Sequence, residues 1–513
     1  MFGSKRDAAI LVVLQIALGL AYLNSVPRIH VDEAWDSSLG YNLACQGSLK
    51  HPFVEGFGGM QIHFVQNRVV LPLVCAAIFK VVPYNIATSR IGSVLFGALA
   101  VVGIYAVMRR RFGEKQAFWV ALATIVNPWF FEISRRARPE IYYTALALVF
   151  LWLMVVYFDS GSRRSAFFAG VLAGLSALTH PNGVILIFSI GLAVVIWNRN
   201  KPIGRLILWT SVGFSIVILP YIIYVLWAIQ NPQVSFIKQM QASMVQGPIL
   251  HSEIIRWRSF LRWPKGAPLA AVMLIAWLAA WYRSSSAEKI LATIIPLFAF
   301  LLSFASVNPT GRYLAAIVPF SAALIIRFIW RIITGSIISQ NWRKTRFAIG
   351  MCTGLGYLLM CITGIILLFY HLSGADFNKI IQHVASVVKP DSRVYGDPIF
   401  WFGRDHYRYG PWIYIPKTKT VAVSEAINRA SKHRFDYAVR IILPAGTQLP
   451  PLTMPGFNDD SVCDWICRIL GTKIDEFRDP YYGPIEIYKL DWDKPSRKLQ
   501  IKGRGRQVLR PLE

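Results

Sequence analysis

Charged residues are scarce in this chain of 513 residues, and acidic residues are the scarcest. Asp, Glu, Lys and Arg together make up 16% of the sequence, against about 25% in an average soluble domain. Hydrophobic residues make up 55%, and the formal net charge is +27. This composition excludes an ordinary soluble enzyme and a disordered chain, and it indicates a membrane protein that crosses the bilayer several times.

Cysteine is also rare. Six cysteines occur in the whole chain, and the only close pair, Cys463 and Cys467, has the spacing C-x-x-x-C. No metal-ligand pattern is present, and a disulfide-rich secreted module is excluded. The pair is interpreted as two thiols, either free or bonded to each other. The sequence also contains no internal repeat of 20–50 residues.

The charge is unevenly distributed along the chain. Residues 1–370 hold 32 of the 54 Lys and Arg and 11 of the 27 Asp and Glu, so that the remainder has a nearly ordinary soluble composition. We therefore predict a membrane part at 1–370, a small α/β extramembrane domain at 371–493 and a basic tail at 494–513. The tail is either simply solvated or in contact with anionic lipid headgroups. In the α/β domain, the pattern predicts a helix at Phe377–Val388 and strands at Arg393–Tyr395, Trp412–Ile415, Tyr437–Ile442 and Ile485–Lys489.

Eleven apolar runs are candidates for membrane-spanning helices, since a span needs roughly 17–25 mainly apolar residues. The first is read as an uncleaved helix rather than a signal peptide. The shorter run 68–83 carries Lys80 and two prolines, and it is predicted to lie on the membrane surface. The eleven runs are 8–24, 87–108, 116–131, 141–158, 166–179, 183–197, 206–229, 267–282, 290–306, 313–330 and 347–370.

Basic residues fix the expected orientation. They are much denser in one set of alternate loops, including Arg109–Arg111 and Arg163–Arg164, than in the other set. The positive-inside rule then places the N-terminus in the cytoplasm. An odd number of spans puts the C-terminal domain outside, which predicts a multi-pass inner (plasma) membrane protein with a periplasmic or extracytoplasmic domain.

Charged residues near the predicted outer face are costly there and do not anchor this topology, so they are candidates for a functional role. The first group, His30 to Asp36, follows the first predicted span, and Asp32 in it is a candidate general base for a hydroxyl. The alternative is that Asp32 merely caps a helix beginning at Glu33. The long first outer loop that holds this group is expected to contain amphipathic helices.

A second outer group is Arg135-Arg136-Ala137-Arg138-Pro139-Glu140. Arginine forks can bind an anionic oxygen pair, so these residues are candidate phosphate ligands. The alternatives are contact with lipid headgroups for the arginines and an ordinary helix start for Pro139-Glu140.

Two shorter outer segments add His180, in Thr179-His180-Pro181, and Arg312, in Arg312-Tyr313-Leu314. His180 could bind phosphate or metal or have no role, and Arg312 could pair with phosphate or with lipid. Carboxylates and arginines on one membrane face suit a reaction in which an acid activates a hydroxyl and a phosphate departs. A transporter for an anionic lipid would use the same elements.

In order and sidedness, these motifs resemble the GT-C membrane glycosyltransferases. The closest branch holds the protein O-mannosyltransferases and the aminoarabinose transferase of lipid A modification. The resemblance covers about residues 1–330. It is carried by Asp32-Glu33, Arg138-Pro139-Glu140, the segment from Gly174 to Pro181, and the segment from Arg312 to Pro319, with the run that begins at Arg90 after the first motif.

The resemblance implies a GT-C catalytic domain at 1–370 that uses a polyprenyl-phosphate sugar as donor and transfers the sugar with inversion. It implies Asp32 as the base, Glu33 as its assistant or as a sugar ligand, and Glu140 as a second acid near the donor. Arg138 and Arg312, with Arg135 and His180, are the candidate ligands of the donor phosphate, although His180 stands where many relatives carry Lys. Some relatives use a divalent metal, for which His30, Asp32 and Glu140 are the candidate ligands.

The expected partners are the lipid-linked sugar, membrane lipids and an acceptor, with no nucleic acid. The acceptor is lipid A or another envelope glycan, or a protein, and the sequence names neither the sugar nor the acceptor. Two alternatives from other classes are a transporter or flippase for a lipid-linked sugar and a non-catalytic envelope assembly protein. A transporter predicts inverted repeats and charges at mid-membrane depth, which the sequence does not show.

Overall fold

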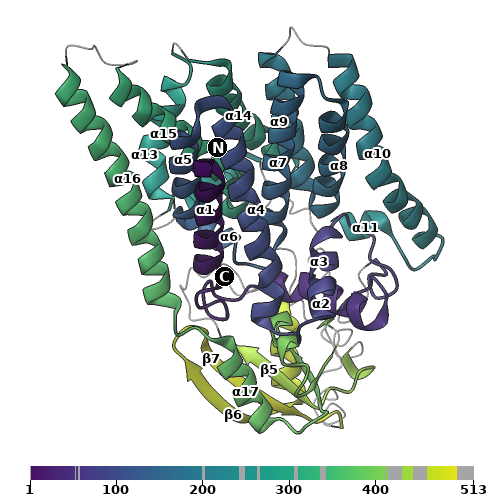
Figure 1. Ribbon diagram of the computed structural model, residues 1–513. Helices are drawn as coiled ribbons and strands as arrows, with labels where there is room; N and C mark the ends of the chain where they lie inside the picture. Colours follow the sequence, from purple (N-terminus) through teal and green to yellow (C-terminus); the bar gives the residue numbers. More distant parts are fainter. Residues whose placement is uncertain are drawn as a thin grey trace.

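The apolar runs of the first 372 residues form a bundle of long helices that ends on a small domain (Figure 1). A computed structural model describes residues 2–51, 54–55, 58–198, 203–241, 249–262, 266–282, 284–305, 310–335, 342–410, 412–413, 430–442 and 459–493. The predicted basic tail at 494–513 lies outside these ranges. The long helices are α1 (Phe2–Leu20), α4 (Ile86–Phe112), α5 (Glu114–Ile125), α7 (Pro139–Ser160), α8 (Arg163–Thr179), α9 (Pro181–Trp197), α10 (Ile203–Ala228), α13 (Ala267–Ala279), α14 (Ser286–Ala305), α15 (Val318–Thr334) and α16 (Arg343–Leu372).

The predicted spans overlap these helices, and six helical segments among the described residues are long and apolar enough to cross a membrane. The prediction for 116–131 was wrong in detail, because two helices share that stretch. The helix α5 ends at Ile125, and α6 (Pro128–Ile133) begins with Pro128 at its first turn. The Asn127 side chain accepts a hydrogen bond from the Trp129 amide at 3.0 Å and caps the new helix.

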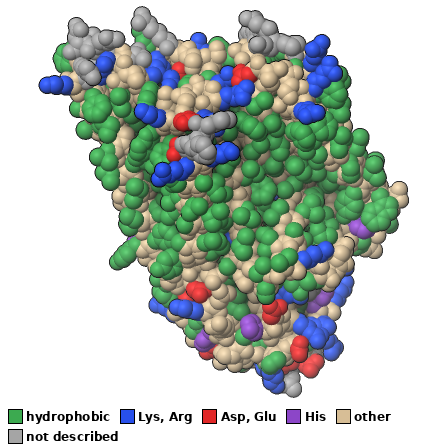
Figure 2. All heavy atoms as spheres, in the orientation of Figure 1, with side chains coloured by type: hydrophobic (Ala, Val, Ile, Leu, Met, Phe, Trp, Pro, Cys, Tyr) green, Lys and Arg blue, Asp and Glu red, His purple; other side chains and the backbone are tan. Residues whose placement is uncertain are grey.

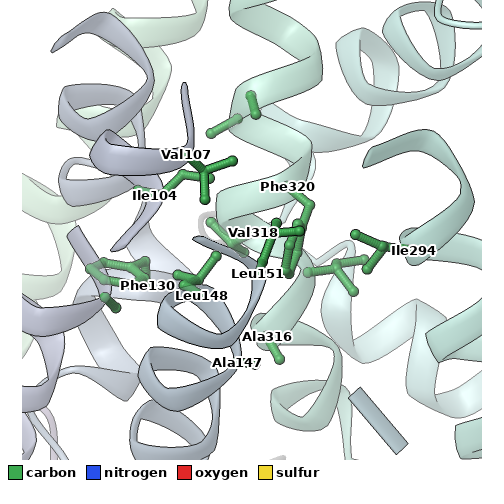
Figure 3. Packing of buried hydrophobic residues seen from close by; sticks show 14 of the residues in the cluster. Ile104, Val107, Phe130, Ala147, Leu148, Leu151, Ile294, Ala316, Val318 and Phe320 are labelled. Atoms are coloured by element: carbon green, nitrogen blue, oxygen red, sulfur yellow. The ribbon is translucent and has the colours of Figure 1, made fainter. Parts of the chain in front are cut away.

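The bundle has a continuous apolar core. Ile104 of α4, Leu148 and Leu151 of α7 and Phe320 of α15 are all buried and pack together (Figure 3). The outward surfaces are apolar as well, and Ile223 of α10 and Leu355 of α16 are 66% and 58% exposed. Figure 2 shows a broad apolar band between two ends that carry charged side chains, as expected of helices that face lipid.

Two helices of the first long loop lie at one end of the bundle: α2 (Val31–Gln46) and α3 (Val70–Phe79). Gly40 permits their close packing, since a Cβ there would lie 2.5 Å from the Cβ of Cys75. The helix α3 falls inside the run 68–83 that was predicted as a surface helix. The remaining short elements are α11 (Phe236–Gln241), α12 (Ile249–Phe260) and the 3₁₀ helix η1 (Gly311–Ile317), which precedes α15.

The C-terminal domain is built on a five-stranded sheet in the order β3-β2-β5-β7-β6. Its strands are β2 (Arg393–Gly396), β3 (Arg408–Tyr409), β5 (Tyr437–Ile441), β6 (Gly471–Asp479) and β7 (Gly483–Leu490). The strand β2 is parallel to β3 and β5, while β7 is antiparallel to β5 and β6. The domain also contains helix α17 (Phe377–Val387), the 3₁₀ helix η3 (Pro398–Gly403) and α19 (Asp459–Leu470).

The predicted strand at 412–415 does not join this sheet. Its described part, β4 (Trp412–Ile413), pairs in parallel with β1 (Val54–Glu55) of the first long loop. Aromatic contacts join the two parts as well, since Tyr84 stacks on Phe402 at 5.5 Å between ring centroids. We call the end of the bundle that carries α2, α3 and this domain the domain face; it lies at the bottom of Figure 1.

Candidate active site

The first turn of α2 places three side chains at the domain face. His30 is the N-cap residue of this helix, and its Nδ1 accepts a hydrogen bond from the Asp32 amide at 3.2 Å. The alternative interpretation of Asp32 as the helix cap was therefore wrong, because α2 begins two residues before Glu33. Asp32 is left on the first turn, and its side chain is 14% exposed.

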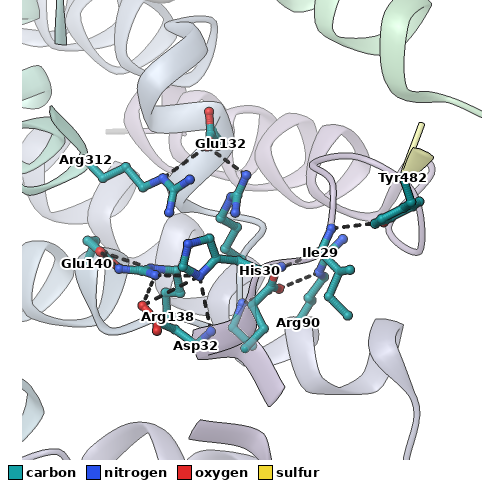
Figure 4. A network of polar contacts seen from close by, with 12 residues as sticks. Ile29, His30, Asp32, Arg90, Glu132, Arg138, Glu140, Arg312 and Tyr482 are labelled. Atoms are coloured by element: carbon teal, nitrogen blue, oxygen red, sulfur yellow. Dashed lines mark hydrogen bonds and ion pairs between the residues drawn. The ribbon is translucent and has the colours of Figure 1, made fainter. Parts of the chain in front are cut away.

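The guanidinium of Arg138 joins this turn to the start of α7. It forms an ion pair with Asp32 and contacts His30 Nδ1 at 3.0 Å. On its other side it donates to Glu140, with Nη2 at 2.8 Å and Nε at 3.1 Å from Oε1 (Figure 4). Burial alone would lower the pKa of Arg138, but Asp32 and Glu140 raise it, so the side chain stays charged. The two predicted acids thus share one buried cation.

Glu33 has a different environment from its neighbour Asp32. Its two carboxylate oxygens accept from Arg90 Nε at 2.7 Å and Nη2 at 2.9 Å, from the Ala137 amide at 3.1 Å and from the His30 amide at 2.9 Å. Burial alone would raise the pKa of Glu33, but Arg90 holds it below its usual value. Because Arg90 also donates to the Leu23 carbonyl, the Glu33–Arg90 pair fastens α2, α4, the chain after α1 and the chain before α7 together.

A second carboxylate with two arginines lies beside this cluster. Glu132 of α6 is 3.0 Å from Arg136 Nη2 and 3.7 Å from Arg312 Nε of η1. All three side chains are at least nine-tenths buried. Figure 4 shows Glu132 above the Arg138 group, so Arg136 and Arg312 bring positive charge to the same region.

Two of the predicted phosphate ligands, Arg135 and His180, make contacts other than those predicted. Arg135 turns toward α1, where Nη1 donates to the Leu18 carbonyl at 3.1 Å and Nη2 to the Ala21 carbonyl. It therefore satisfies carbonyls at the end of α1 instead of joining the cluster. His180 is the N-cap of α9, and its Nδ1 accepts from the Asn182 amide at 3.1 Å. Burial holds the pKa of His180 well below its usual range, so the imidazole is neutral.

His180 nevertheless lies close to the cluster. Its ring centroid is 5.7 Å from that of Tyr313 and 6.1 Å from that of Tyr143. The charges of Arg68, Glu140 and Arg138 act on it. A neutral imidazole between two tyrosines can donate a hydrogen bond but does not supply positive charge to a phosphate.

Two functional candidates, Asp36 and Arg68, were missing from the predicted set. Asp36 lies one turn after Asp32 on α2 and is 1% exposed. Arg68 lies just before α3, and its Nε is buried without a hydrogen-bond partner. Burial alone would lower the pKa of the Arg68 guanidinium, but Asp36 and Asp32 raise it, which keeps it charged. The i, i+4 spacing of Asp32 and Asp36 was the available signal for the carboxylate.

The three candidate metal ligands, His30, Asp32 and Glu140, surround the side chain of Arg138. Each contacts the Arg138 guanidinium, which occupies the position that a shared metal ion would need. Within the described ranges, no group of three or more His, Cys, Asp or Glu residues could hold a metal ion. These residues therefore fit an arginine-centred site and do not fit a metal centre.

Chemically, the domain face presents a partly accessible carboxylate next to a set of cations. Asp32 can accept a hydrogen bond or a proton from a hydroxyl group. Arg68, Arg136 and Arg312 can stabilise negative charge that develops on a departing phosphate. The Ile29 amide donates to the Tyr482 hydroxyl at 3.3 Å, so the C-terminal domain contacts the residue next to His30.

Comparison with known proteins gives matches to enzymes of one kind. The model of the family described as Dolichyl-phosphate-mannose-protein mannosyltransferase matches residues 68–227. No curated protein matches the sequence.

Solved structures match over nearly the whole chain. ArnT from Cupriavidus metallidurans, bound to undecaprenyl phosphate, superposes with a TM-score of 0.64 at 12% identity, over 93% of this chain and 97% of that one. Oligosaccharyltransferase AglB from Archaeoglobus fulgidus, with an inhibitory peptide and a dolichol-phosphate, gives 0.55 at 13% identity, over 97% and 76%. Arabinofuranosyltransferase AftD from Mycobacteria gives 0.52 at 14% identity, over 95% and 41%.

These matches confirm the predicted GT-C fold, a bundle of apolar helices with a small C-terminal sheet domain. The three matched proteins are glycosyltransferases, as are the members of the family whose model matches residues 68–227.

Proposed function

We propose that the chain transfers a sugar from a polyprenyl-phosphate donor to an acceptor at the domain face, with inversion at the sugar carbon. The observation that carries the proposal is the Asp32–Arg138–Glu140 group, beside Arg68, Arg136 and Arg312, in a GT-C fold. A polyprenyl-phosphate donor is supported by the undecaprenyl phosphate bound to ArnT and the dolichol-phosphate bound to AglB. The density of basic residues in the opposite loops supports an extracytoplasmic domain face.

The reaction is a single displacement. The acceptor oxygen attacks C1 of the sugar, and the bond between C1 and the phosphate oxygen breaks, with its electron pair leaving on the polyprenyl phosphate. Asp32 takes the proton of the acceptor hydroxyl, and Arg138 orients the Asp32 carboxylate. Arg68 and Arg312 bind the phosphate and stabilise the charge that it gains.

Glu140 has a positioning role in this scheme. It binds two nitrogens of Arg138 and so fixes the guanidinium that Asp32 contacts. Glu33 acts less directly, because it holds together the segments that carry Asp32 and Arg138. The acceptor class is an envelope glycolipid, including lipid A, or a protein.

The test compares the wild type with Asp32→Asn. Both would be purified in detergent and incubated with a panel of polyprenyl-phosphate sugars and with envelope lipids and peptides, and products would be read by mass spectrometry. We expect transfer by the wild type and a loss of about 10²- to 10⁴-fold in the variant. The control is Asp159→Asn, which removes a carboxylate paired with Arg111 at 3.0 Å on the opposite face and should leave transfer unchanged.

Equal transfer by the wild type and Asp32→Asn would remove Asp32 from the mechanism but leave the enzyme class. No transfer by the wild type across the panel would contradict the proposed function, and it would return weight to a transporter or an assembly protein.

A further inference from the structure

Asp36 is a buried carboxyl group that the proposed reaction has not used. It lies in the second turn of α2 and is 1% exposed. No described residue donates a hydrogen bond to either of its carboxylate oxygens. Buried carboxyl groups in proteins are nearly always hydrogen-bonded, so an isolated one in a polar region points to a functional use.

Asp36 follows Asp32 by one turn of α2 and is the more deeply buried of the two. Residues four apart on a helix lie on the same face, so the two side chains are neighbours along α2. Asp32 is 14% exposed and can be reached from outside, whereas Asp36 is closed off. A substrate hydroxyl can therefore contact Asp32 but not Asp36, which lies one turn further along α2.

Charged and titratable groups face Asp36 from every neighbouring element. They are Arg68 before α3, Asp32 on α2, and Arg138 and Glu140 at the start of α7. Cys75 of α3 and Tyr142 of α7 also lie within its field. Among the described residues, Arg68 is its strongest opposite charge, but no ion pair within 4 Å joins the two.

Asp32 and Asp36 differ in the contacts that their carboxyl groups make. Protonating Asp32 would break its ion pair and leave the Arg138 guanidinium buried with one carboxylate fewer. Protonating Asp36 breaks no contact and removes a charge from a desolvated position. Burial, with the nearby charge of Asp32, raises the pKa of Asp36 to about 7 even though Arg68 opposes the shift.

We propose, building on the transferase function above, that Asp36 receives and holds the proton that Asp32 takes from the acceptor hydroxyl. Asp36 is ionised before the reaction. As the bond from the acceptor oxygen to C1 forms, the hydroxyl proton moves to Asp32 and then to Asp36, while the electron pair of the broken C1–oxygen bond leaves on the phosphate. Asp32 returns to its ion pair with Arg138, and Asp36 later releases the proton to water.

The experiment measures single-turnover transfer against pH for the wild type and Asp36→Asn. The wild-type rate should rise between about pH 6 and pH 8, because only ionised Asp36 can accept the proton. In Asp36→Asn the rate should fall by about 10²-fold or more, and this rise should disappear. Binding of polyprenyl phosphate should stay within about 2-fold, since Asn has the size and shape of a protonated Asp.

The matched control is Asp36→Glu, which restores an acid at the same position and should recover the rise with pH. A second measurement does not depend on activity. Infrared spectra of the wild type should contain a protonated carboxyl band that fades between about pH 6 and pH 8, and the band should be absent from Asp36→Asn.

The outcomes separate the two proposals. Transfer by Asp36→Asn at the wild-type rate and with the wild-type pH profile overturns the role of Asp36 alone. If the variant does not fold, a wild-type infrared spectrum without a titrating carboxyl band overturns it as well. A band that titrates normally in a protein that transfers nothing overturns the transferase function and with it the catalytic use of this proton site.

Discussion

Two buried charge clusters, one at each end of the bundle, differ in whether they are complete. The domain-face cluster comprises His30, Asp32, Asp36, Arg68, Glu132, Arg136, Arg138, Glu140 and Arg312. The opposite-face cluster comprises Gln116, Ser285, Glu288, Arg327 and Arg331. Both use arginine and glutamate, and α4 spans the distance between them.

The opposite-face cluster closes on itself. Glu288 accepts from Arg327 Nε at 3.1 Å and from the Ser285 amide and hydroxyl at 2.9 Å and 3.0 Å. Arg331 donates to the carbonyls of Ala279 and Tyr282. These contacts tie α5, α13, α14 and α15 together, as expected of a structural network.

Some groups of the domain-face cluster lack hydrogen-bond partners in the part of the chain that the structure describes. Asp36 has no hydrogen-bond partner among the described residues, and Arg68 has a buried Nε without one. A network that lacks partners costs stability unless a ligand completes it. Composition does not separate these two clusters, whereas the unfilled hydrogen-bonding positions of Asp36 and Arg68 do.

The largest expected effect comes from removing the central arginine of each cluster. Arg138→Gln should lower transfer by about 10³-fold, because Asp32 loses its orienting cation and two carboxylates are left facing each other. Arg327→Gln should leave transfer within about 2-fold and lower only the melting temperature, since Glu288 keeps its bonds to Ser285. Transfer rates per folded molecule and melting curves in detergent measure both.

Arg138→Lys sharpens the test. Lysine keeps the charge but cannot fork between Asp32 and Glu140, so an intermediate rate is expected. A loss of transfer in Arg327→Gln equal to that in Arg138→Gln would show that the two clusters do not differ in function.

The next effect concerns two adjacent carboxylates within the domain face. Glu33→Gln should cost about 3–5 kcal/mol of unfolding free energy, because Arg90 is then buried without a counter-charge. Asp32→Asn should cost less, since Asp32 is partly exposed. Urea or thermal unfolding at neutral pH compares the two variants.

The pH dependence of stability follows from the sign of the Glu33 shift. The folded-state pKa is lowered, so its stabilisation is complete above the unfolded value and is lost as the pH falls through the folded one. Melting temperature should therefore fall less steeply in acid for Glu33→Gln than for the wild type. An identical acid slope in both proteins would contradict the assignment of Glu33 as the fastening residue.

Much of the fold was predictable because the hydrophobic runs that specify its helices are local features of the sequence. The apolar runs became helical, since a backbone in lipid must satisfy its own hydrogen bonds. The strand β6 was missed, because most of its side chains are exposed or partly exposed and it lacks the expected apolar alternation. The pairing of β4 with β1 was also beyond prediction, since it joins residues more than 350 positions apart.

The residue types of the candidate site were predictable from the sequence, but the directions in which their side chains point were not. Asp32, Arg138 and Glu140 do meet, because helix starts on one membrane face bring them together. Arg135, Arg136 and Arg138 looked equivalent, yet they bind α1, Glu132 and Asp32 respectively. The chain turns sharply between α6 and α7, so neighbouring side chains point apart, and no sequence period predicts that turn.

The smallest expected effect separates two arginines that both adjoin the lipid-facing bundle, Arg68 and Arg135. Arg68→Ala should raise the KM for the donor by about 10- to 100-fold with a smaller change in kcat, which corresponds to one charge-assisted hydrogen bond to a phosphate. Arg135→Ala should leave that KM unchanged and lower the melting temperature, because its partners are the Leu18 and Ala21 carbonyls. Initial rates measured at varied donor concentration give the KM of each variant for comparison. A KM that rises equally in both variants would place the phosphate near α1 and would contradict the assignment of Arg68 as its specific ligand.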